Sequence, residues 1–129
     1  MYEDYKGDVD FLTVYVREAH PEDEWQMKSN LKENDNVCYA QPKNMKDRLL
    51  IANDFSKRFN FTPPLVVDTM ANTANNLYAA WPERLYVIDA DKRLLYVGGN
   101  GPFKFYPNEV RELLAKRYGA KGAPAAPAK

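Results

Sequence analysis

Glu18 and His20 are the residues of this chain best suited to acid–base chemistry. They stand two positions apart in the run REAHP, residues 17–21, and His20 is the only histidine among 129 residues. Histidine changes its charge closest to neutral pH, so this pair could donate or accept a proton. A lone histidine is more often a hydrogen-bonded structural residue, and from these two residues alone both interpretations stay open.

The segment before this pair indicates where the pair lies. Residues 11–16 form an almost unbroken run of β-branched and aromatic residues, which predicts a strand buried on both faces, as in a parallel sheet. Pro21 follows and prevents its continuation. Ligands and catalytic groups of open α/β sheets gather beyond the carboxyl ends of the strands. We therefore expect Arg17, Glu18 and His20 at such an edge.

Cys38 is the single cysteine, which excludes an intramolecular disulfide and any site built from several cysteines. Cys38 and the one histidine are too few soft ligands for structural zinc, and we expect no metal site. Cys38 could be a nucleophile that pairs with His20. Its neighbours Val37 and Tyr39 favour the alternative, a cysteine that packs as a small hydrophobic residue.

Composition indicates one globular domain without a strong electrostatic field. Eighteen Lys and Arg balance eighteen Asp and Glu, so nucleic acid is not an expected partner. No apolar run reaches the roughly 18 residues of a membrane span, and the first residues do not resemble a signal peptide. The sequence thus predicts a cytoplasmic chain with no membrane segment of its own.

The first half of the chain contains three further predicted elements. Residues 1–6 have the pattern of a helix end that stops at Gly7, and residues 22–41 are polar and irregular, as in a long loop. Asn44 is a plausible N-cap for an amphipathic helix over 43–59. Its expected buried stripe consists of Met45, Leu49, Ala52, Phe55 and Phe59.

The second half alternates short strands and helices. A strand over 65–68 precedes a helix that begins at Asp68 or Thr69 and ends at Pro82, a proline for which cis and trans forms stay open. Strands over 84–89 and 93–97 predict a hairpin, followed by a glycine-rich turn at 98–102, which lacks the residues of a phosphate loop. In the helix that begins at Asp68 or Thr69, the expected buried stripe is Met70, Ala74, Leu77, Tyr78 and Trp81.

The C-terminal helix is predicted over 107–118, between Pro107 and Gly119. Its expected buried stripe is Val110, Leu113, Leu114 and Tyr118. Residues 119–129 are rich in alanine and proline and read as a disordered tail. A hairpin followed by a helix, with a proline just before the hairpin, is typical of the second half of a thioredoxin-like domain.

Several long motifs resemble the iodothyronine deiodinases and their bacterial relatives. They are DVDFLTVYVREAHPEDEW from residue 8, KDRL from 46, PLVVDTMANTANNLYAAWPERLYVID from 64, and YVGGNGPFKF with NEVRELL from 96. The resemblance extends from Asp8 to about Tyr118. It implies an α/β fold, a thioredoxin-like three-layer sandwich with a mixed sheet, incomplete at its N-terminus, over residues 1–118.

The resemblance also implies site residues. Glu18 and His20 match the family's catalytic glutamate and histidine, which are thought to relay a proton to the carbon that loses iodide. Expected substrate-binding residues are Trp25, Trp81, Arg84 and Asn100, although an aromatic residue at position 81 more often belongs to the core. Pro42 replaces a second functional histidine of the animal enzymes, and Asn100 replaces an arginine that some of them have.

In that family a selenocysteine, or a cysteine, precedes the strand that leads to the REAHP run, and this chain has no matching loop. We therefore expect Met1 to be a false start after a recoded codon. The predicted function is that of the C-terminal portion of a deiodinase-like selenoenzyme, an oxidoreductase with no bound cofactor and an external thiol reductant. Its substrate would be a small halogenated aromatic molecule or a peroxide. The alternative is a non-catalytic binding module that uses residues 98–103 and 22–41, and a homodimer is possible in either case.

Overall fold

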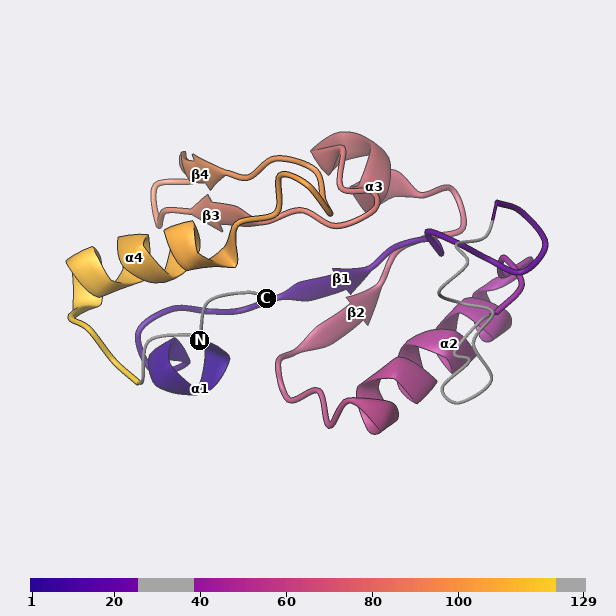
Figure 1. Ribbon diagram of the computed structural model, residues 1–129, viewed down its shortest axis with the longest axis horizontal. Helices are drawn as coiled ribbons and strands as arrows, with labels where there is room; N and C mark the ends of the chain where they lie inside the picture. Colours follow the sequence, from indigo (N-terminus) through magenta and orange to yellow (C-terminus); the bar gives the residue numbers. More distant parts are fainter. Residues whose placement is uncertain (26–38, 123–129) are drawn as a thin grey trace. The chain divides into compact units, whose positions relative to one another are not determined.

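The computed structural model describes residues 1–25 and 39–122. In these ranges helices and strands alternate in the predicted order, with four helices and four strands. The chain divides into two compact units, which Figure 1 shows with their elements labelled. One unit is Thr13–Pro82, and the other joins Met1–Leu12 to Glu83–Lys129. Within the described ranges, no helix is long and apolar enough to cross a membrane.

The Thr13–Pro82 unit is built on a parallel strand pair. Strand β1 (Thr13–Tyr15) pairs with β2 (Leu65–Val67), and Val14 lies opposite Val66. The pairing confirms the parallel arrangement expected of the first strand. Burial on both faces was a wrong prediction, because Val14 and Val66 are both exposed. A continuous apolar run does not reveal that only one face of a strand pair is covered.

Helix α2 (Met45–Arg58) follows the predicted N-cap but buries a different face. The side chain of Asn44 accepts a hydrogen bond from the Asp47 amide at 3.0 Å, which confirms the cap. Met45, Leu49 and Phe59 of the predicted stripe are exposed. Ala52 is buried and confirms that part of the stripe, and the other buried residues are Arg48 and Ile51. The prediction failed because it counted only apolar side chains, whereas the buried face includes an arginine.

Helix α3 (Thr73–Tyr78) is shorter than predicted and has no buried residue. Its predicted stripe is wrong, since Leu77 is 78% exposed. The carboxylate of Asp68 accepts hydrogen bonds from the amides of Ala74 and Asn75, which fixes the first turn later than expected. Ala79 has a left-handed backbone conformation that ends the helix before Trp81. The Trp81–Pro82 peptide bond is cis, one of the two forms that the sequence left open.

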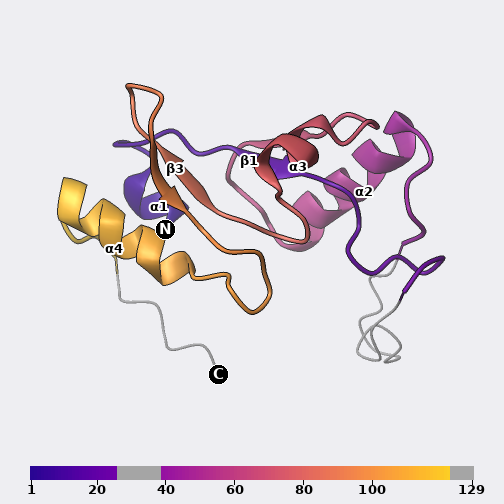
Figure 2. The ribbon, with the colours of Figure 1, turned by 90° about the horizontal axis from the view of Figure 1, so that it is seen from above.

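The other unit contains the predicted hairpin and the C-terminal helix. Strands β3 (Tyr86–Ile88) and β4 (Leu94–Val97) pair antiparallel, and helix α4 (Pro107–Tyr118) follows them. Figure 2 shows α4 and this hairpin from a second direction. Helix α1 (Tyr2–Tyr5) supplies Tyr5, which packs with Val110 and Leu114 as the apolar core. Val110 and Leu114 confirm that part of the predicted stripe, whereas Tyr118 is exposed.

The strands therefore form two two-stranded sheets, one parallel and one antiparallel. The α/β class is confirmed, with both kinds of pairing that a mixed sheet contains. The joining of these pairs into one thioredoxin-like sheet stays a prediction, as does the single domain over 1–118. Of the predicted tail, residues 123–129 lie outside the described ranges, as do residues 26–38 of the predicted long loop.

Candidate functional site

Glu18 follows strand β1 at its carboxyl end, as the sequence predicted. The Tyr15 hydroxyl, at the last position of the strand, donates a hydrogen bond to the Glu18 carboxylate. Burial of Tyr15 raises the pKa of its hydroxyl, and the hydrogen bond and negative charge of Glu18 raise it further. Tyr15 therefore keeps its proton at neutral pH and holds the carboxylate in one orientation.

The main chain of Glu18 is also held on both sides. Its amide donates to Oε1 of Gln41 at 3.1 Å, and its carbonyl oxygen accepts from Nε2 of Gln41 at 3.3 Å. The indole Nε1 of Trp81 donates to the same carbonyl oxygen at 3.4 Å. The segment that bears Glu18 is thus bound to chain regions before α2 and after α3.

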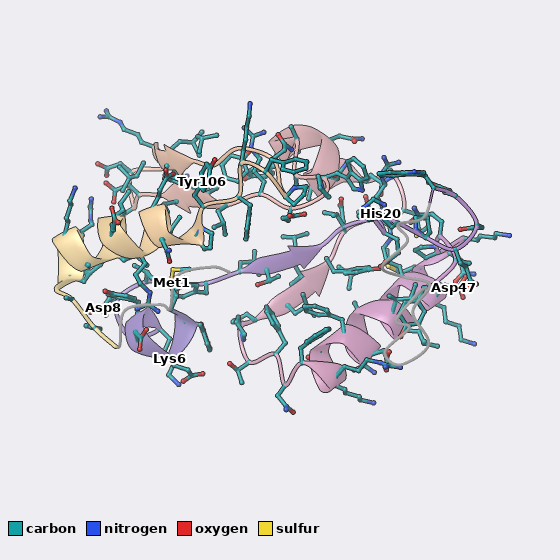
Figure 3. All side chains as sticks on the ribbon, viewed as in Figure 1. Met1, Lys6, Asp8, His20, Asp47 and Tyr106 are labelled. Atoms are coloured by element: carbon teal, nitrogen blue, oxygen red, sulfur yellow. The ribbon has the colours of Figure 1, made fainter. Side chains whose placement is uncertain are left out.

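His20 lies beyond the end of β1, where Figure 3 labels it. Its Nδ1 is 3.4 Å from the carbonyl oxygen of Trp25, and the two rings meet edge to face at 4.7 Å between centroids. A carbonyl oxygen only accepts hydrogen bonds, so this contact favours a proton on Nδ1 of the neutral ring. Trp25 is 71% exposed, so its indole is available to a ligand.

Trp81, which follows α3, contacts the segment that bears Glu18. Besides its bond to Glu18, its ring lies 5.1 Å from the guanidinium carbon of Arg17, a cation–π contact. Its half-buried position and its bonded indole nitrogen agree with the structural alternative for this residue. The structure thus brings four predicted site residues into one unit, namely Glu18, His20, Trp25 and Trp81.

Arg84 and Asn100 belong to the other unit. Nε of Arg84 donates to the carbonyl oxygen of Gly98 at 2.6 Å, and its guanidinium lies over the ring of Tyr86. The carbonyl oxygen of Asn100 accepts from the Lys104 amide at 3.2 Å. Both residues therefore shape the glycine-rich turn of their own unit, and their part in binding a substrate stays a prediction.

The glycines of this turn have a packing reason that supports its interpretation as a plain turn. A Cβ atom on Gly99 would lie 2.4 Å from Cβ of Lys104, closer than two non-bonded carbon atoms can approach.

No group of three or more potential metal ligands occurs within residues 1–25 and 39–122. Cys38, the alternative nucleophile, lies outside these ranges.

A buried polar pair, Arg48 and Asp68, was missed from the sequence. The Arg48 guanidinium donates to the carbonyl oxygen of Thr69 at 2.6 Å and to Oδ1 of Asn72 at 3.0 Å. Burial alone would raise the pKa of Asp68. Three backbone amides that donate to its carboxylate, together with the charge of Arg48, outweigh this effect and lower the pKa. The pair joins α2 to the turn after β2.

Tyr15 and Gln41 were also missed. Tyr15 could have been found from the strand, because it stands three residues before Glu18 on a segment about to end. Gln41 carries no such signal, because its bonds to Glu18 span 23 residues of sequence.

The sequence profile of the iodothyronine deiodinases matches residues 1–118. The chain belongs to the iodothyronine deiodinase family. Type I iodothyronine deiodinase of Xenopus laevis is 36% identical over 114 residues, which are 88% of this chain and 42% of that protein. The human type II enzyme is 35% identical over 120 residues, 92% of this chain and 43% of its own length. This deiodinase-family chain therefore spans less than half the length of these relatives, and the family predicted from its motifs is confirmed.

Proposed function

We propose that this deiodinase-family chain supplies the proton-transfer part of a reductive dehalogenation site on a thioredoxin-like fold. His20 would be the proton donor when its ring carries both protons, and Glu18 would orient the segment that bears it. The main support is the geometry after β1, where Tyr15 holds the Glu18 carboxylate and the Trp25 carbonyl oxygen faces Nδ1 of His20. The relatives are named for the removal of iodine from thyronines, which makes an aryl iodide the first substrate to test.

The proposed reaction needs a nucleophile and a reductant besides these residues. A selenolate, or a thiolate, takes the iodine from the aromatic carbon as the carbon–iodine bond breaks, and the carbon receives the proton from His20. Two molecules of an external thiol then release iodide and restore the nucleophile, and they leave as a disulfide. Residues 1–25 and 39–122 contain no cysteine or selenocysteine, and we propose that the nucleophile lies outside these ranges.

Trp25 is the proposed contact for the aromatic ring of the substrate. Its exposed indole lies against the His20 ring, so a substrate stacked on it would bring a ring carbon close to the proton donor. The substrate-binding roles of Arg84 and Asn100 stay predictions. We also propose a cytoplasmic location and a homodimer.

The test uses the native gene product, isolated from its source cells. Its mass and selenium content show whether a selenocysteine-bearing segment is present, and iodide release from an iodophenol with dithiothreitol measures activity. We expect His20→Asn to reduce iodide release by about 100-fold or more, the range of a lost general acid. Asn53→Ala changes an exposed amide on α2 in the same unit and should leave the rate unchanged.

A second candidate function is a binding module without catalysis. The side chain of Phe103, at the glycine-rich turn, is 88% exposed, which suits a contact with a partner. A native mass equal to that of this chain, with no iodide release, would favour this function over dehalogenation. Iodide release that is unaffected by His20→Asn would instead remove His20 from the mechanism.

A further inference from the structure

Gln41 makes a contact that neither the family motifs nor the predicted site includes. Its side-chain amide binds both main-chain groups of Glu18, with Oε1 accepting from the amide at 3.1 Å and Nε2 donating to the carbonyl oxygen at 3.3 Å. A neighbouring strand would offer the same donor and acceptor. Gln41 thus replaces a strand partner at a position that lies beyond the end of β1.

The main chain of Glu18 needs such a partner. Glu18 is half-buried and lies outside the strand ladder, which ends at Tyr15. A main-chain group that is removed from water and has no hydrogen-bond partner destabilises the folded chain. With Trp81 as a second donor to the carbonyl oxygen, the Glu18 peptide receives three bonds from two other parts of the chain.

Gln41 is itself held in place, which allows it to fix another residue. The main-chain amide of Gln41 donates to Oδ1 of Asp23 at 2.7 Å. Two residues earlier, the carbonyl oxygen of Tyr39 accepts from the Glu22 amide at 2.9 Å. These two bonds tie residues 39–41 to the segment that follows His20, so both sides of the histidine are tied to the same short stretch.

We propose that Gln41 is a positioning residue. It fixes the Glu18 peptide, and by doing so it sets the direction of the Glu18 carboxylate toward Tyr15 and of the His20 ring toward the Trp25 carbonyl oxygen. The effect on catalysis rests on the proposed function, whereas the effect on geometry does not. Gln41 acts through Glu18 and His20 and has no contact of its own with reacting atoms.

Two substitutions separate the bonds that Gln41 makes. Gln41→Met keeps nearly the length and volume of the side chain and removes both hydrogen bonds. Gln41→Glu keeps the acceptor for the Glu18 amide and loses the donor to the carbonyl oxygen. Asn53→Ala is the control, because it removes an exposed amide from α2 in the same unit.

The readouts are exchange of the Glu18 amide hydrogen and the ¹⁵N signals of the His20 ring, both by NMR on the full chain. Since His20 is the only histidine, its ring signals need no further assignment. We expect Gln41→Met to speed exchange of the Glu18 amide by about tenfold or more, as for one lost hydrogen bond. In this variant the His20 ring signals should change from those of a ring protonated at Nδ1 toward an average of the two tautomers. Gln41→Glu should retain amide protection, and Asn53→Ala should resemble the wild type.

Unchanged exchange and unchanged ring signals in Gln41→Met would overturn the inference. If Gln41→Met does not fold, Gln41→Glu decides: retained amide protection with altered ring signals supports positioning, and unaltered ring signals refute it. In the native gene product, Gln41→Met should lower kcat for iodide release about tenfold and leave KM unchanged, because only proton delivery is affected. A chain in which Gln41 controls the His20 signals, yet His20→Asn leaves iodide release intact, would refute the proposed function and keep the positioning role.

Discussion

The two units of this chain differ in the polar groups that they bury. The unit of Met1–Leu12 and Glu83–Lys129 is centred on an apolar cluster of Tyr5, Val110 and Leu114. The Thr13–Pro82 unit buries Arg48 and Asp68, only 2% and 4% exposed, as well as the apolar residues Ile51 and Ala52. Apolar burial contributes free energy without direction, whereas hydrogen bonds from a guanidinium and a carboxylate fix the groups they reach.

This difference follows the location of the predicted catalytic residues. Glu18 and His20 lie in the unit that buries Arg48 and Asp68, where side-chain hydrogen bonds hold the main chain of Glu18. The other unit contains the apolar cluster and the glycine-rich turn. We conclude that this fold positions its candidate catalytic residues with directional bonds, and that the apolar cluster contributes stability instead.

The largest expected effect comes from removal of Arg48. Arg48→Met removes the donor to the part-buried carbonyl oxygen of Thr69 and side chain of Asn72, and it takes a positive charge away from the buried Asp68 carboxylate. We expect the free energy of unfolding to fall by about 4 kcal/mol, the range for a broken buried polar network. Fluorescence during urea unfolding measures this loss, since the only two tryptophans, Trp25 and Trp81, are in this unit. A loss below about 1 kcal/mol would mean that the polar pair is not what holds the unit.

A smaller effect is expected in the apolar unit. Leu114→Ala removes a buried side chain from the cluster with Tyr5 and should cost about 3 kcal/mol, as for other buried leucines. Hydrogen exchange of the α4 amides measures this cost. Leu94→Ala, at an exposed strand position, is the control and should cost about 1 kcal/mol or less. Equal costs for both leucines would contradict an apolar centre at Leu114.

The smallest expected effect is a pH dependence that arises at Asp68 in the Thr13–Pro82 unit. Because the pKa of Asp68 is lowered in the folded chain, its carboxylate stabilises the fold above the ordinary value of 3.8. This contribution is lost as the pH falls through the lowered pKa. The effect is modest because protonation leaves the side chain in place. Urea unfolding from pH 7 downward should show the gap between wild type and Asp68→Asn closing at low pH, and a constant gap would exclude this origin.

Local sequence signals predicted most of the elements. The β-branched run, the Asn44 cap, the hairpin and the Pro107 helix start all depend on neighbouring residues, and the structure has each of them. The buried face of α2 and the length of α3 could not be predicted in this way. Both are decided by bonds to Asp68 and its surroundings, which come from distant parts of the chain.

The location of the candidate site could be predicted from the sequence, whereas the residues that hold it in place could not. The end of a buried strand pointed to Glu18 and His20, and the motifs added Trp25 and Trp81. Gln41 was missed because a glutamine in a polar stretch has no distinguishing pattern, and its partner is 23 residues away. Residues that hold a site are fixed by three-dimensional proximity, for which a single sequence gives few signals.

The bonds around the Glu18 peptide also have a consequence for the order of folding. Gln41 reaches Glu18 across 23 residues of sequence, and Trp81 reaches it across 63. Contacts of such separation require closure of long chain loops, which slows their formation relative to helices and hairpins. We expect α2, α4 and the β3–β4 hairpin to form first and the peptide of Glu18 to be immobilised late. A folding intermediate would then have most of its helices and no ordered segment around Glu18.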